Sequence, residues 1–385
     1  AATGPSVRSS HPRAAAVYYA LALLVVTGLL GMIVSGDLFN VFVFLEVSSI
    51  ASYALVASGG GPGLAAAFRY LVLGTAGASF YLLGVGFLYA LTGSLNMADL
   101  AARLPPLADS PLFTGGVAFI AVGLAIKMGL FPLHGWLPDV YTHAPSHVAS
   151  LLAPIATKAS AYVLARVLLY VLHAGVPVTT LVAWAGAAAV VAGGALALRQ
   201  VDARRLLAYS SVSQMGYIAL GIGVGNTIGL AGAYLHILNH ALMKAALFLA
   251  LGAAAFAGRG PALTAGGLGR MPVTGACAIV AALSMVGVPP VGGFFSKWYL
   301  LQGAIEAGQP LLVAAILAGS LLAAVYMYRL TEAVWFGKPA PRATLEAPVP
   351  MLVALVLLAT GIVAAGLGNA AIVAHLLLPA TAEVR

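Results

Sequence analysis

Residues 125–158 read AIKMGLFPLHGWLPDVYTHAPSHVASLLAPIATK, and this stretch decides the fold. It begins inside a hydrophobic span at Lys127, breaks at Phe131-Pro132, crosses a polar patch and returns to apolar sequence up to a second lysine, Lys158. A lysine at the centre of a bilayer costs about 2.5–3.5 kcal/mol on insertion scales, so it is rarely there without a use. Two lysines that flank a proline-broken helix indicate a path for ions through a membrane.

The composition defines the class of protein. Hydrophobic residues make up 62% of the 385 residues and charged residues 7%. A soluble domain carries about 25% charged residues, so the chain is an integral membrane protein. The net charge of +8 does not indicate nucleic-acid binding, because the arginines fall in short loops where membrane topology explains them. The single cysteine, Cys277, excludes an internal disulfide, an iron–sulfur site and a cysteine zinc site.

The apolar spans have the length of membrane helices rather than of barrel strands, which predicts an all-α polytopic fold. Two spans are too long for a simple crossing, and each is broken by proline, at Pro132 and at Pro289-Pro290. We predict eleven crossings, at 15–35, 38–57, 64–92, 111–142 (broken), 148–172, 179–198, 205–223, 228–256, 273–307 (broken), 310–336 and 347–378.

The loop charges predict the orientation. If each broken segment crosses once, the positive residues on one side are Arg8, Arg13, Arg199, Arg204, Arg205, Arg259, Arg270, Lys338 and Arg342. Only Arg103 and Arg385 fall on the other side. Positive residues favour the cytoplasmic face, so we expect residue 1 to be cytoplasmic and the C-terminus to lie on the far side.

The broken spans are the fourth and ninth crossings, and this odd offset makes them run in opposite directions. That arrangement predicts two inverted five-helix repeats, at 1–178 and 179–340, followed by a C-terminal helix at 341–385. Because the chain starts at Ala1 without a signal peptide, we expect the natural protein to extend upstream.

Lysine usage carries the functional prediction. Four of the five lysines fall inside predicted spans, namely Lys127, Lys158, Lys244 and Lys297. Arginine stays charged at any accessible pH, whereas a buried lysine can lose its proton because burial disfavours the charged form. Lysines in the membrane therefore indicate proton movement. The alternative is that these lysines snorkel or form ion pairs for packing.

Glu46 lies near the middle of the second crossing and needs a cationic partner, for which Lys127 is the natural candidate. An opposite charge within about 4–6 Å would hold Lys127 protonated, and its withdrawal would release the proton. The alternative is a static buried ion pair. Asp37 and Asp139 fall at helix ends, where they suit caps or interfaces.

His236, His240 and Lys244 are spaced i, i+4 and i+8, so they share one helix face. Two histidines four apart can bind zinc, but there is no HExxH glutamate and no obvious third ligand. A proton relay suits the row better, because histidine titrates near neutral pH. Hydrogen-bonded core histidines are the alternative.

Further polar residues follow the second half of the chain and the first break. Ser210, Ser213 and Gln214 can hold water or bond a neighbouring helix. Lys297 follows the second break and suits the end of a relay. Loop histidines after the first break are candidates for proton entry, namely His134, His143 and His147.

Together these motifs resemble the proton-translocating antiporter family. That family includes the D-type membrane protein of Mrp multisubunit sodium/proton antiporters and the antiporter-like membrane subunits of respiratory complex I and membrane-bound hydrogenases. The resemblance rests on GDLFNVFVFLEV, IKMGLFPLHGWLPDVYTHAPS, LLAYSSVSQMGY, HILNHALMKAALF and GVPPVGGFFSKW. It implies inverted five-helix units and a polar axis of Glu46, Lys127, Lys158, His236, His240, Lys244 and Lys297.

The chain departs from the family pattern in three places. About three further helices are expected upstream, which makes about fourteen in all. Arg204 and Arg205 stand where many members have a lysine, and we expect no long lateral helix after the last span. The phrases LEVSSIASYALV, TGSLNMADL and FFSKWYLLQGAIEAG are most similar to the Mrp D type.

The resemblance implies a proton-conducting subunit that exchanges H⁺ for Na⁺ or another monovalent cation in a bacterial inner membrane. Its partners would be other membrane subunits, with no nucleic acid, cofactor or metal of its own. One alternative is an antiporter-like subunit of a redox-driven NADH:quinone oxidoreductase or hydrogenase. Others are an intramembrane metalloenzyme that uses His236 and His240, and a purely structural subunit.

Overall fold

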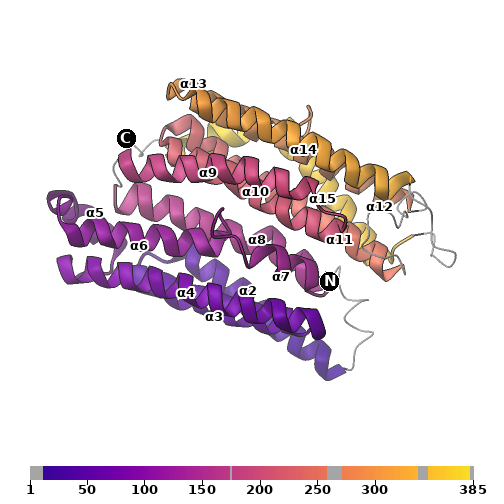
Figure 1. The fold of residues 1–385 in the computed structure, drawn as a ribbon, viewed down its shortest axis with the longest axis horizontal. Coiled ribbons are helices and arrows are strands. Elements are labelled where there is room, and N and C mark those ends of the chain that lie inside the picture. Colours follow the sequence, from indigo (N-terminus) through magenta and orange to yellow (C-terminus); the bar gives the residue numbers. More distant parts are fainter. Residues whose placement is uncertain (1–11, 174–175, 258–270, 337–345, 382–385) are drawn as a thin grey trace.

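The computed structural model describes residues 12–173, 176–257, 271–336 and 346–381. Long helices lie roughly side by side in one bundle (Figure 1), and the described residues contain no strand beyond an isolated bridge between Asp37 and Asn96. The elements are α2 (Pro12–Val34), α3 (Leu38–Ala57), α4 (Gly61–Thr92), α5 (Met97–Arg103), η1 (Pro105–Leu107), α6 (Pro111–Met128), α7 (Leu137–His143), α8 (Ser146–Ala165), η2 (Arg166–Val171), α9 (Val176–Leu198), α10 (Ala203–Val224), α11 (Thr227–Phe256), α12 (Pro272–Val286), α13 (Gly292–Glu306), α14 (Pro310–Phe336), α15 (Val349–Leu367), α16 (Asn369–Ile372), η4 (Val373–Leu377) and α17 (Leu378–Thr381).

Nine spans in the described part of the chain are long and apolar enough to cross a membrane. They correspond to nine of the predicted crossings, so the prediction of an all-α polytopic protein is confirmed. The other two are 205–223, which forms α10, and 273–307, which forms α12 and α13. Each of α12 and α13 has 15 residues. Such a helix is about 22 Å long at 1.5 Å per residue, so only the pair together spans a hydrocarbon core of about 30 Å.

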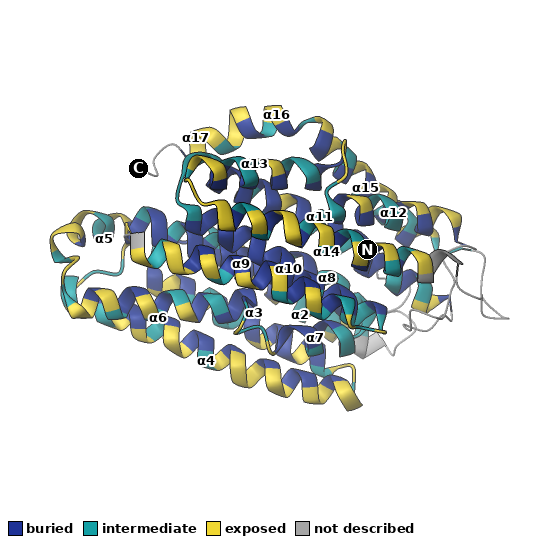
Figure 2. Cartoon of the chain, turned by 45° about the horizontal axis from the view of Figure 1, so that its top comes forward, coloured by how far each residue is buried: buried dark blue, intermediate teal, exposed yellow. Residues whose placement is uncertain are grey.

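Helix α10 is more polar than its neighbours because it lies inside the bundle. Ser210, Ser213 and Gln214 are fully buried, as is nearly all of the helix. Polar side chains at membrane depth are tolerated where protein surrounds them. Figure 2 shows the same division for the whole bundle, with buried residues on inward faces and exposed residues along the outer faces of helices such as α4.

Both predicted helix breaks are present. Helix α6 ends at Met128, Gly129 adopts a φ of 68°, and helix resumes only at Leu137. Helix α12 ends at Val286, Gly287 adopts a φ of 91°, and α13 starts at Gly292. A positive φ suits glycine, which stops a helix without steric penalty, and the prolines that follow cannot continue it. Each break leaves irregular backbone inside the bundle.

Paired glycines let neighbouring helices approach closely. A Cβ atom built at Gly216 of α10 would lie 2.6 Å from the carbonyl oxygen of Gly186 on α9. Between α4 and α6, a Cβ atom built at Gly84 would lie 2.6 Å from the carbonyl oxygen of Gly116. Small residues at such contacts are typical of membrane helices, whose association depends on close packing.

The C-terminal crossing differs from the expectation of one helix over 347–378. Helix α15 ends at Leu367, and a short helical segment then runs from Asn369 to Thr381. The interruption has a local cause, since Asn369 Nδ2 donates to the Gly366 carbonyl at 2.7 Å and occupies an acceptor at the helix end. The division into repeats at 1–178 and 179–340 stays a prediction. Of the charges used for topology, six lie outside the described residues: Arg8, Arg259, Arg270, Lys338, Arg342 and Arg385.

Candidate functional site

The four lysines predicted to lie within spans are all buried. The exposed fractions are 7% for Lys127, 4% for Lys158, 0% for Lys244 and 6% for Lys297. These side chains therefore do not snorkel toward lipid or water. They are inward-facing amines, and each forms hydrogen bonds with groups inside the bundle.

Lys127 lies in the last turn of α6 and meets one face of α3. Its Nζ donates to Ser49 Oγ at 2.8 Å and to Tyr53 Oη at 3.4 Å, and it lies 3.5 Å from Glu46 Oε1. The three partners are spaced i, i+3 and i+7, which places them on one side of a helix. The structure thus brings Lys127 and Glu46 together, with the serine as the nearest partner.

Lys158 lies on α8 beside a disturbed helical turn. Its Nζ donates to the Ala153 carbonyl at 2.6 Å, next to Pro154, which lacks a backbone donor of its own. Helix α8 packs against α11, the helix that carries His240 and Lys244. Within the described residues no direct hydrogen bond joins Lys127 to Lys158.

The row on α11 is buried along its length. Lys244 Nζ donates at 2.6 Å to the Leu207 carbonyl and at 2.6 Å to Ser210 Oγ, both on α10. The rings of His236 and His240 stack with centroids 6.0 Å apart and an interplanar angle of 15°. Neither ring nitrogen of His240 has a hydrogen-bond partner among the described residues. Buried polar groups are normally hydrogen-bonded to protein or to ordered water. The two ring nitrogens of His240 are therefore suited to bind water.

His236 connects four helices. Its Nδ1 lies 2.8 Å from Ser296 Oγ on α13, and its Nε2 lies 3.0 Å from Gln214 Oε1 on α10. Gln214 Nε2 in turn donates to Tyr326 Oη on α14 at 3.2 Å. With this amide orientation, Nε2 of the imidazole carries the proton and Nδ1 accepts from the serine.

Lys297 follows the second break and turns back toward it. Its Nζ donates to the carbonyls of Met285 at 2.9 Å and Val286 at 3.0 Å, which are at the C-terminal end of α12. At the C-terminal end of a helix, a lysine donates to carbonyls that have no helical partner. Its positive charge also interacts favourably with the negative end of the helix dipole. The amino group also lies 4.9 Å from the centre of the Tyr217 ring.

Sequence reasoning missed several contact residues. Ser49 and Tyr53 bind Lys127, and Ser296 binds His236. The signal for the first two was their spacing from Glu46 on one face of α3. Ser296 had no such signal, because its contact depends on how α13 packs against α11.

The histidines near the first break occupy different places from those expected. His134 lies in the break, but His143 ends α7 and His147 lies in the first turn of α8, so neither of these is in a loop. Pro145 lies between the end of α7 and the start of α8, so His143 closes one helix and His147 opens the next.

Asp139 of α7 pairs with arginines from two other helices, α4 and α10. It forms an ion pair with Arg69 of α4, and Oδ1 lies 3.6 Å from Arg205 Nη1 of α10. Arg69 was not singled out from the sequence. Asp139 therefore has the interface role that was expected of it. Asp37 has the other expected role: it caps α3 by accepting from Phe39 N and Asn40 N at 2.9 Å.

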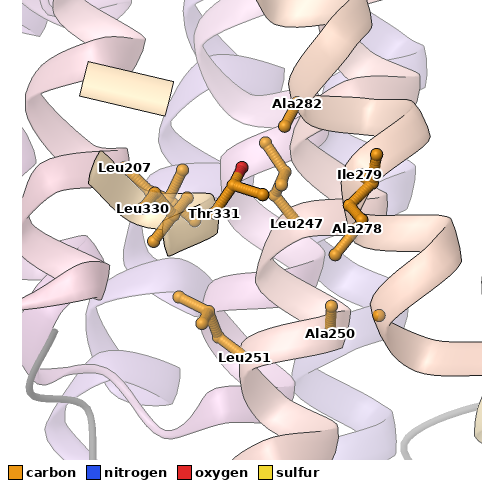
Figure 3. A pocket seen from close by; sticks show the side chains of 10 residues that line it. Leu207, Leu247, Ala250, Leu251, Ala278, Ile279, Ala282, Leu330 and Thr331 are labelled. Atoms are coloured by element: carbon orange, nitrogen blue, oxygen red, sulfur yellow. The ribbon is translucent and has the colours of Figure 1, made fainter. Parts of the chain in front are cut away.

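A small apolar cavity lies beside the partner of Lys244. It measures about 20 Å³ and is lined by Leu207, Leu247, Ala282 and Leu330, with Thr331 as the polar exception (Figure 3). Such a volume holds about one water, but a water needs two to four polar partners. The cavity therefore offers no route for protons. Among the described residues, no cluster of three His, Cys, Asp or Glu side chains suits a metal ion.

Comparison with known proteins shows which family has this arrangement of helices and buried residues. Residues 35–323 match the family described as NADH:quinone oxidoreductase/Mrp antiporter, TM. The chain belongs to this family. The match spans both helix breaks and every predicted site residue, so the antiporter-family resemblance is confirmed.

Two relatives and one solved structure illustrate the range of the family. The chain is 48% identical over 393 residues to the N-type subunit of the NADH-quinone oxidoreductase of Desulforudis audaxviator, covering 97% of this chain and 78% of the relative. It is 33% identical over 325 residues to the D-type subunit of the Na⁺/H⁺ antiporter of Alkalihalophilus pseudofirmus, covering 83% of this chain and 66% of the relative. The membrane-bound sulfane sulfur reductase, an archaeal respiratory membrane complex, contains a chain that superposes with a TM-score of 0.89 at 34% identity, covering 98% of this chain and 77% of that one.

Proposed function

We propose that this chain is a proton-conducting, antiporter-like subunit of a multisubunit membrane complex. One observation carries the proposal: amines and imidazoles from α6, α8, α11 and α13 are buried in the interior of a membrane bundle. Ionisable groups at membrane depth are expensive, and they are typical of ion and proton paths. Lysine and histidine can each give up a proton, whereas arginine cannot.

The proposed relay follows the packing order of the helices, in which α6 contacts α8, α8 contacts α11 and α11 contacts α13. Glu46 and Lys127 form one end, Lys158 bridges to α11, and Lys297 forms the other end beyond His236. Between them, the unpaired ring of His240 is the position where bound water completes the chain, with Lys244 alongside. Glu46 sets the protonation of Lys127 through its charge, so movement of either residue would pass a proton toward Lys158.

The relatives support two kinds of parent complex. The quinone oxidoreductase protein has the higher identity of the two relatives described, which supports a redox-driven assembly. The Na⁺/H⁺ antiporter protein supports exchange of H⁺ for Na⁺. In both cases the partners are other membrane subunits and this chain supplies the proton path. We place residue 1 on the cytoplasmic face of a bacterial inner membrane, because of the predicted charge asymmetry.

Replacement of Lys127 tests the function. Lys127→Ala in the assembled complex, reconstituted in vesicles with a pH-sensitive dye, should abolish proton transport while leaving membrane insertion intact. Lys338→Ala is the matched control, because the sequence places this lysine outside the predicted spans. Unimpaired transport by Lys127→Ala would refute the proposal.

Subunit composition and driving force separate the two parent complexes. A redox-driven assembly should co-purify with a flavin or iron–sulfur protein and acidify vesicles on addition of an electron donor. An antiporter should lack such proteins and move protons in response to a Na⁺ gradient alone.

A further inference from the structure

The two stacked histidines of α11 differ in their partners and not in their burial. His236 and His240 are both 0% exposed. The ring nitrogens of His236 have polar partners at 2.8 and 3.0 Å, whereas those of His240 have none in the described part of the chain. A neutral imidazole carries one proton, and its hydrogen bonds decide which nitrogen holds it. The surroundings of His236 can therefore fix its tautomer, and no described residue does so for His240.

Gln214 of α10 is the partner of Nε2 of His236. Its side chain is fully buried, and its Oε1 lies 3.0 Å from the imidazole nitrogen. The amide nitrogen at the other end donates to Tyr326 Oη of α14 at 3.2 Å. An amide oxygen only accepts and an amide nitrogen only donates. Because Tyr326 occupies the donor end, the acceptor end faces the imidazole, and Nε2 of His236 carries the proton.

The opposite nitrogen of the ring faces a group that can exchange protons. His236 Nδ1 lies 2.8 Å from Ser296 Oγ, and Ser296 directly precedes Lys297 on α13. A hydroxyl can donate and accept at the same time, so it can pass a proton on. An amide has no group that titrates near neutral pH. Gln214 thus closes Nε2 to proton exchange, and Nδ1 stays open.

The contact between α10 and α14 does not depend on Gln214 alone. Tyr217, three residues further along α10, donates to the Ile316 carbonyl at 3.0 Å and lies 3.2 Å from Ser320 Oγ. Both of these groups are on α14. The two helices therefore have a second hydrogen-bonded contact that involves neither ring nitrogen of His236. This second contact makes it possible to separate packing of the helices from control of the imidazole.

We propose that Gln214 is a positioning residue: together with Tyr326, it holds the proton of His236 on Nε2 and directs proton exchange to Nδ1. A proton that arrives at Nδ1 from Ser296 gives an imidazolium whose Nε2–H stays bonded to Gln214. The same proton leaves from Nδ1, which restores the neutral tautomer. His236 therefore takes up and releases protons on the side of α13. This role in transport rests on the proposed function, whereas the tautomer does not.

The tautomer of His236 tests the proposal directly. The assembled complex, with ¹⁵N in its histidine rings, is measured in bilayers by solid-state NMR at mildly alkaline pH, where a histidine imidazole is neutral. Ring nitrogens with and without a proton give separate signals, and His236→Asn identifies the signals of His236 by their loss. We expect the proton on Nε2 in the wild type. A proton on Nδ1 would overturn the proposal, since the amide of Gln214 would then be rotated and donate to the ring.

Two variants remove the constraint in different ways. Gln214→Leu deletes the acceptor at nearly the same size, and Tyr326→Phe removes only the oxygen that holds the amide in its orientation. Each should populate both tautomers of His236. Tyr217→Phe is the matched control and should keep the wild-type tautomer, because it breaks the other contact between α10 and α14 and retains the ring near Lys297. The wild-type tautomer in both Gln214→Leu and Tyr326→Phe would overturn the proposal, as would a mixture of tautomers in Tyr217→Phe.

Proton transport measures the consequence. A mixture of tautomers lowers the fraction of His236 that can accept a proton at Nδ1, so Gln214→Leu should slow initial proton uptake by about twofold or more. A changed tautomer with wild-type transport would overturn the role in proton exchange. Lys127→Ala tests the proposed function separately. It leaves the contact between Gln214 and His236 in place, so the tautomer should be that of the wild type even where transport is lost.

Discussion

Lys127 Nζ lies 3.5 Å from Glu46 Oε1 but 2.8 Å from Ser49 Oγ. The serine therefore holds the amine in place by a hydrogen bond, while the carboxylate acts on it mainly through charge. This separation of position from charge can be tested, because the two partners lie on the same face of α3.

Glu46→Gln should slow proton transport by about tenfold or more. A tenfold change corresponds to about 1.4 kcal/mol, and two charges 4 Å apart interact with about 4 kcal/mol at an effective dielectric constant of 20. Ser49→Ala is the control and should reduce transport by less than Glu46→Gln does, because it leaves the charge pair between Lys127 and Glu46 in place. Initial rates of proton uptake in vesicles measure both. A larger loss from the serine variant would reverse this assignment of roles.

Lys297→Met should abolish transport and destabilise the second helix break. It removes the donor to the Met285 and Val286 carbonyls, and each buried acceptor left unpaired costs about 1–3 kcal/mol. Lys297→Arg separates the two effects, since it keeps a donor and a charge but cannot release a proton. It should retain most of the thermal stability in detergent and still fail to transport. Transport by the arginine variant would count against proton release at this position.

Asp139→Asn should lower the unfolding free energy by about 1 kcal/mol, because exposed ion pairs contribute about 0.2–1 kcal/mol each and two are lost. The effect should shrink in 1 M salt, where screening acts within about 3 Å. Asp99→Asn is the control: it breaks one exposed pair, to Arg103 within α5, and should have the smaller effect. Unfolding in detergent at low and high salt measures the difference. Equal effects of the two variants would mean that Asp139 does not connect α7 to α4 and α10.

Gly216→Ala should destabilise the bundle by about 1–3 kcal/mol, the usual penalty for overpacking. The new Cβ atom would lie 2.6 Å from the Gly186 carbonyl and 2.6 Å from Val190 N, and backbone atoms cannot easily move aside. Gly86→Ala is matched to it, because nothing lies within 4 Å of a Cβ atom built there. That control should be neutral or slightly stabilising, since alanine favours helix over glycine by about 0.5–1 kcal/mol. Thermal unfolding of both variants decides whether α9 and α10 depend on this contact.

Local features of the chain could be predicted well. The composition implied membrane helices, and the prolines near Gly129 and Gly287 implied two broken spans, because a missing backbone donor acts within one turn. The shared face of His236, His240 and Lys244 followed from helical spacing alone. Errors arose where helices meet turns: His143 and His147 lie in helices, and the last span ends at Leu367.

The sequence by itself determined that this protein crosses a membrane, where its helices break and which amines lie inside, since hydrophobicity and backbone chemistry act over one span. Only the tertiary structure decided which groups accept hydrogen bonds from those amines. They are Ser49 and Tyr53 for Lys127, and Leu207 and Ser210 for Lys244. It also decided that residues of α2 and α15 line one hollow. These relationships join residues tens to hundreds of positions apart, and they follow from how helices pack rather than from any local pattern.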